Sequence, residues 1–155
     1  MSIIPTSGPG IGIEPRTETV TLTTHAAIAI GDVVAVSPTV NSDGQFYLTQ
    51  APLSGNATID DNEFGVFAVA LEVIASGSDG RFAVAGIVDA ATDGTSDVSV
   101  GSALQVDPSA EMNLNFADAA GAKVVGFAIE ARSTDSVGLI KVMFDGYHGF
   151  GTVHT

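Results

Sequence analysis

Alternation of apolar and polar positions predicts β-strands along most of the chain. Two stretches show it most clearly, and each continues through a turn into a second apolar stretch: 65–73 with 81–88, and 124–131 with 137–144. In both first strands the odd-numbered positions carry the bulkier apolar residues, whereas the even-numbered positions are mostly small and end in a glutamate. Because strand side chains point alternately to opposite faces, we expect the bulky faces to build the core. The small-residue faces would let another sheet or another subunit approach closely.

The two hairpins align when Glu72 is placed on Glu130. The candidate subunit-interface residues on the small faces are Ala68, Ala70, Glu72, Gly126, Ala128 and Glu130. Paired carboxylates are also the machinery of glycoside hydrolases, but the chain has no Trp to serve as a sugar platform. We therefore expect both glutamates to cap strand ends at a rim or at a subunit interface.

Further short strands are predicted on either side of these hairpins. They lie at 17–24, 33–36, 46–49, 101–107 and 113–116. The first is rich in β-branched residues, and an Asp-Gly turn joins the second to the third as a hairpin. Helix signals are weak, with at most a short helix at 26–30 or 109–120. Eight to ten short strands predict an all-β fold, as a small β-barrel or β-sandwich.

The order of elements agrees twice along the chain. Gly101 follows Gly31 by 70 positions, whereas the two aligned glutamates are 58 apart, so we expect extra residues in a loop of the first half at 49–61. The expected organisation is an extended N-terminal arm at 1–16, a β-domain at 17–146 with two weakly similar halves (31–90 and 101–146), and a C-terminal tail at 147–155.

The N-terminal arm has no strand pattern. Prolines and glycines interrupt it, and because proline lacks a donor and glycine is conformationally free, we expect no regular structure in isolation. Four isoleucines spaced among them predict an arm that docks on a neighbouring protein. The sequence is also compatible with a flexible terminus, or with an arm that packs on its own domain. The candidate contact residues are Ile3, Ile4, Pro5, Pro9, Ile11, Ile13 and Pro15.

The C-terminal tail places aromatic side chains among glycines. Tyr147, His148 and Phe150 alternate with Gly146, Gly149 and Gly151. Such a segment is suited either to a groove on a neighbouring subunit or to packing on its own barrel, and the sequence leaves both open.

Charge excludes several classes of partner. Eighteen acidic residues face five Lys and Arg, for a net charge of −13. Such a chain repels nucleic-acid phosphates and anionic membranes, so we expect neither as a partner. Charged residues make up only 15% of the chain, which favours a surface partly covered by other subunits. The chain shows no secretory signal and no apolar run of the roughly 20 residues that a membrane helix needs.

The sequence contains no catalytic, cofactor or metal motif. Cysteine is absent, and the three histidines lack zinc-site spacing. Neither a nucleophile elbow nor a phosphate loop is present. The acidic cluster at 60–63 offers oxygen ligands but not the spacing of a calcium loop. We therefore expect no enzymatic activity and no cofactor.

Several runs together resemble a known family. GDVVAV at 31–36 and GVFAVALEVIASGSDGRFAVAGIVDA at 65–90 are followed by GSALQVD at 101–107 and GFAIEA at 126–131. This succession is similar to small capsid decoration, or cement, proteins of tailed bacteriophages, over about 31–145. The tail beyond Phe144 extends past the usual ending of that family.

The resemblance implies a β-tulip-like protein that binds the outside of a phage head, commonly as a homotrimer, and bridges neighbouring major capsid protein subunits. It also implies that the N-terminal arm makes the capsid contact, and that the protein is made in the host cytoplasm before joining the virion. The alternative is a phage head-fibre or tail module that binds carbohydrate or another host surface. With no Trp and two Tyr, the chain has few platforms for a sugar.

Overall fold

The computed structural model describes residues 17–51, 66–93, 98–107, 112–117, 123–133 and 137–151. Within these ranges the chain is all-β without a helix, which confirms the predicted fold class. The described residues include no helix long and apolar enough to cross a membrane. The N-terminal arm and the loop at 52–65 lie outside the described residues.

Nine strands are formed by the described residues, and all belong to one hydrogen-bonded sheet. They are β1 (Glu18–Thr23), β2 (Val33–Val40), β3 (Tyr47–Gln50), β4 (Phe67–Ala70), β5 (Asp79–Thr92), β6 (Ala103–Val106), β7 (Leu114–Phe116), β8 (Gly126–Ala128) and β9 (Gly138–Asp145).

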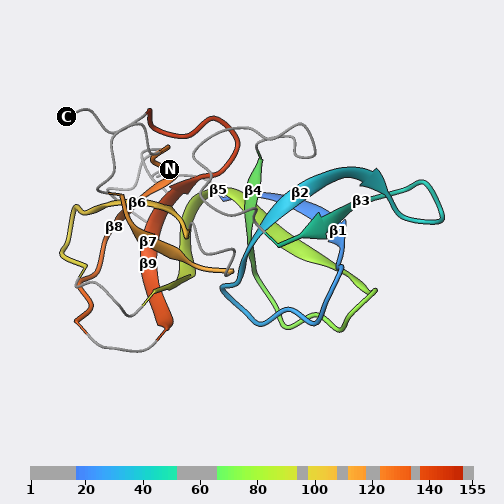
Figure 1. The fold of residues 1–155 in the computed structure, drawn as a ribbon, viewed down its shortest axis with the longest axis horizontal. Coiled ribbons are helices and arrows are strands. Elements are labelled where there is room, and N and C mark those ends of the chain that lie inside the picture. Colours follow the sequence, from blue (N-terminus) through green and yellow to red (C-terminus); the bar gives the residue numbers. More distant parts are fainter. Residues whose placement is uncertain are drawn as a thin grey trace, which may run out of the picture.

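The sheet closes on itself twice. Strands β1, β3, β2, β4 and β5 form one five-stranded barrel, here called ring 1, because β1 also pairs with β5. Strands β5, β7, β6, β8 and β9 form a second barrel, ring 2, because β5 also pairs with β9. Residues 79–85 of β5 pair with β1 and residues 85–92 pair with β9. This 14-residue strand therefore belongs to both rings and passes between them (Figure 1).

The two rings repeat one pattern of pairing. In each, the first strand runs parallel to the third, and the remaining four contacts are antiparallel. The entry to the second strand is also repeated: the N–H of Gly31 donates to the Ala70 carbonyl at 2.9 Å, and that of Gly101 to the Ala128 carbonyl at 2.8 Å. Both glycines have a left-handed φ, of 86° and 88°, a conformation that favours glycine. These equivalences use the same spacings of 70 and 58 positions that relate the two halves of the sequence.

Two buried clusters hold the rings together. Ring 1 encloses the first, which includes Leu22, Val34, Phe82 and Val84. Ring 2 encloses the second, whose largest members include Leu104, Leu114, Val142 and Phe144. The second cluster also contains side chains that point outward from ring 1: Val33, Ala35, Phe67, Val69 and Ala83. The outer face of ring 1 thus packs against ring 2 in one continuous core.

The expectation that odd-numbered bulky residues build the core is wrong for the second hairpin. In β4 all four residues are buried, since both faces of the strand are covered. In β8 the small residues Gly126 and Ala128 face inward and Phe127 is exposed, and in β9 Met143 is exposed while Val142 is buried. The interior of ring 2 takes the even-numbered face, and the bulky face of β8 points outward.

Candidate functional site

The small residues that the sequence indicated as candidates for a subunit interface are buried within the subunit. Ala68 and Ala70 belong to the cluster within ring 1, and Ala128 to the core shared by both rings. Gly126 lies close to Val142: a Cβ added at Gly126 would be 2.6 Å from Val142 Cγ1. The close approach that these residues permit is therefore between strands of one subunit.

The two aligned glutamates perform the same structural task in each ring. Glu72 Oε2 accepts hydrogen bonds from the backbone N–H and the Nε–H of Arg81, at 3.2 and 3.3 Å. Glu130 Oε2 accepts the backbone N–H of Lys141 at 3.1 Å. Each carboxylate bridges the two strands of its own hairpin, near the place where the first strand ends.

The described part of the tail lies on its own subunit. The N–H of Gly146 donates to the Val84 carbonyl, and the N–H of Phe150 donates to the Val124 carbonyl, at 2.9 and 2.8 Å. Of the two alternatives left open by the sequence, residues 146–151 adopt packing on their own barrel. The backbone N–H groups of Tyr147 and His148 both donate to Asp145 Oδ1, and both side chains are exposed.

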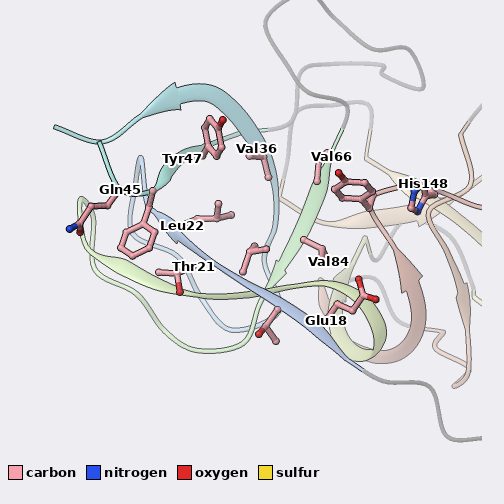
Figure 2. Close-up of a pocket in the computed structure, with 13 residues that line it drawn as sticks. Glu18, Thr21, Leu22, Val36, Gln45, Tyr47, Val66, Val84 and His148 are labelled. Carbon is pink, nitrogen blue, oxygen red and sulfur yellow. The ribbon is translucent and has the colours of Figure 1, made fainter. Parts of the chain in front are cut away.

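A pocket of about 860 Å³ lies at one end of ring 1. Leu22, Val36 and Val84 of the ring interior form its apolar floor (Figure 2). Polar residues at its rim include Glu18 at the start of β1 and His148 in the turn after β9. An apolar floor with a polar rim fits an apolar side chain or segment.

Sequence reasoning did not find this pocket. Its lining comes from β1, β2, β3 and the two residues before it, the residue before β4, β5 and the C-terminal turn. These segments are far apart in the sequence and meet only because the ring closes. The apolar positions that line it have the same alternation as ordinary core positions, so no local signal distinguishes them.

Among the described residues, the surroundings clearly shift the pKa values of three titratable groups. Burial lowers the pKa of His25, whose Nδ1 lies 2.7 Å from Thr49 Oγ1. Burial raises the pKa of Asp32, and the hydrogen bond from the Ala29 N–H partly opposes that rise. Burial lowers the pKa of Lys123, which the neighbouring Asp145 carboxylate partly restores. His25 and Asp32 lie in the segment between β1 and β2, and Lys123 lies just before β8.

Metal ligands do not gather in the part of the chain that the structure describes. No group of three or more His, Asp or Glu residues there could hold an ion. The acidic cluster at 60–63 lies outside the described residues.

Comparison with known proteins identifies the family. A model of the phage cement protein family matches residues 13–144. The fold is similar to that in the crystal structure of the head fiber gp8.5 N base of bacteriophage phi29, with a TM-score of 0.56 and 15% sequence identity, over 90% of this chain and 100% of that chain. No curated protein sequence matches. Because the family match covers most of the sequence, the chain belongs to the phage cement protein family.

Proposed function

We propose that this protein binds the outer surface of a phage head and stabilises the contacts between neighbouring major capsid protein subunits. The family match over residues 13–144 carries this conclusion. The role is structural and requires no cofactor. A net charge of −13 suits a shell protein that faces solvent at high local concentration.

The N-terminal arm makes the capsid contact. It precedes β1, so its 16 residues can reach up to about 50 Å from the body when extended. Burial of an isoleucine side chain contributes about 1.5–3 kcal/mol, and the arm carries four of them, at positions 3, 4, 11 and 13. Ordering a flexible segment opposes this gain by a few kcal/mol, so one arm binds with modest net affinity.

Self-association compensates for the modest affinity of one arm. In a homotrimer three arms act together, and the second and third bind at high effective concentration once the first is in place. Avidity of this kind gives firm attachment from weak individual contacts.

Deletion of residues 1–15 tests the role of the arm. The truncated protein should keep its fold and its oligomeric state but fail to co-sediment with expanded, undecorated phage heads. Replacing the four arm isoleucines by serine should have the same effect. Val73→Ser is the matched control, because Val73 is an apolar residue 77% exposed on the body. Undiminished co-sedimentation of the truncated protein would refute the assignment of the arm.

A second candidate is the base module of a head fibre. The similarity of fold to the phi29 head fiber gp8.5 N base favours it. Such a module would attach to the head and present a further binding domain or host-binding surface. Binding to a glycan array without binding to undecorated heads would favour adhesion over capsid stabilisation.

A further inference from the structure

A row of side chains on the outside of ring 1 is buried against ring 2. Val33 of β2 pairs in register with Val69 of β4, which pairs in turn with Ala83 of β5. All three side chains are 0% exposed and belong to the core that the rings share.

In the equivalent row on ring 2, two of the three residues are exposed. Ala103 of β6 pairs with Phe127 of β8, which pairs with Met143 of β9. Phe127 and Met143 are 36% and 37% exposed. By strand order and register these three residues take the places that Val33, Val69 and Ala83 occupy in ring 1.

Neighbouring apolar side chains extend this row. Ile87 pairs with Met143 and is 38% exposed, and Phe150 is 42% exposed with its ring edge-on to Phe127 at 5.0 Å. With about 150–250 Å² for each aromatic side chain, Phe127 and Phe150 together present about 150 Å² of apolar surface, and Ile87 and Met143 enlarge the patch. Contiguous apolar patches of a few hundred Å² on soluble proteins are often functional.

The patch carries little net charge. Asp89 and Lys141, on the strands that carry Ile87 and Met143, form an ion pair at 3.4 Å. Asp145 interacts electrostatically with Lys123. A second copy of a chain with net charge −13 meets less repulsion here than at a surface of unpaired carboxylates.

The surface of ring 2 that covers the row of ring 1 has an equivalent surface on ring 1 itself. Val106 and Phe144 of ring 2 belong to the core that buries Val33, Val69 and Ala83. Val36 of ring 1 is equivalent in register to Val106 of ring 2. Val84 of β5 is likewise equivalent to Phe144 of β9, by the pairing of β5 with β4 and of β9 with β8. Val36 and Val84 are on the floor of the open pocket at the end of ring 1 (Figure 2).

We propose that ring 2 of one copy packs its exposed row over the ring 1 pocket of a second copy, repeating between subunits the contact that joins the two rings within each subunit. The contact is head-to-tail, because the two surfaces are different, and such contacts generate closed rings when the rotation between copies closes. Three copies would form a circle of six barrels. This inference deepens the proposed self-association and rests on it, but not on capsid binding.

The full-length protein in solution tests this contact through its mass, measured by analytical ultracentrifugation. Phe127→Asp alters the row, and Val20→Arg alters the pocket at an exposed lining residue of β1. Each variant should be monomeric while the wild type is oligomeric. Val73→Asp, on neither surface, should keep the wild-type mass. Circular dichroism verifies folding, and Met143→Lys replaces Phe127→Asp if that variant unfolds.

Mixing distinguishes a head-to-tail contact from a symmetric one. An equimolar mixture of Phe127→Asp and Val20→Arg contains one intact row and one intact pocket, so it should form a heterodimer. A monomeric wild type, wild-type mass in either folded variant, or a mixture that stays monomeric would overturn the proposal. Oligomers that assemble as described yet fail to bind heads would leave the contact established and refute the cement function instead.

Discussion

Gly146 joins the two rings, and replacing it by alanine should destabilise the protein severely. It directly follows β9, and its N–H donates to the carbonyl of Val84, while its own carbonyl accepts the N–H of Phe67, both at 2.9 Å. Both partners belong to ring 1. A Cβ added here would overlap the Phe67 carbonyl oxygen and lie 2.6 Å from Cζ of Phe144.

The size of the effect follows from these contacts. The Phe67 carbonyl is backbone within β4, so it cannot move aside without disturbing the strand. Overpacking of a well-packed interior costs about 1–3 kcal/mol, and loss of the two hydrogen bonds adds about 1 kcal/mol each. Gly146→Ala should therefore lower the free energy of unfolding by about 3–5 kcal/mol, a large share of the 5–15 kcal/mol typical of a domain.

Urea unfolding followed by circular dichroism measures this loss. Gly101→Ala is the matched control, because Gly101 has a φ of 88° but nothing within 4 Å of an added Cβ. It should lose only the strain of a left-handed alanine, about 1–2 kcal/mol. If Gly146→Ala lost no more than this control, the rings would not be joined as tightly as the structure indicates.

Two further predictions concern polar groups. Glu72→Ala and Glu130→Ala should each lower the free energy of unfolding by about 0.5–1 kcal/mol, because each removes an exposed carboxylate bond to a strand N–H; strongly unequal losses in thermal unfolding would contradict equivalent roles. For His25, burial lowers the pKa of the folded state, so the unfolded chain binds more protons and stability falls as pH drops below the ordinary histidine range. His25→Asn should flatten the dependence of unfolding free energy on pH between about 7 and 5, and an unchanged slope would show that other groups cause it.

Strand positions were predictable from the sequence because they depend on local alternation and turns. Glycine turns and β-branched runs marked the hairpins, and the repeated glycines and glutamates marked equivalent points of both halves. The sequence pattern predicts too early an end for β5, because Ala90, Ala91 and Thr92 do not alternate between apolar and polar. These three residues are all buried, and the turn at Gly31 lies against this end of the strand, where the Ala91 N–H donates to the Gly31 carbonyl at 2.8 Å.

Ring closure and side-chain orientation were not predictable in this way. Each ring closes through a parallel contact of its third strand, Thr23 with Leu48 and Thr92 with Leu114, between segments that no local pattern connects. The orientation of Phe127 depends on which face of β8 turns toward the ring interior, and the alternation is the same for either choice. The pocket and the exposed row are consequences of that closure, so they emerged only from the structure.

Retention of DNA by heated phage heads is the most direct test of the cement function. DNA-filled heads lacking the protein would be heated with and without it, and DNA release would be followed with a fluorescent dye. A cement protein should raise the release temperature in proportion to occupancy, and the variant lacking residues 1–15 should leave it unchanged. Full binding of the wild-type protein with no rise in release temperature would contradict a stabilising role.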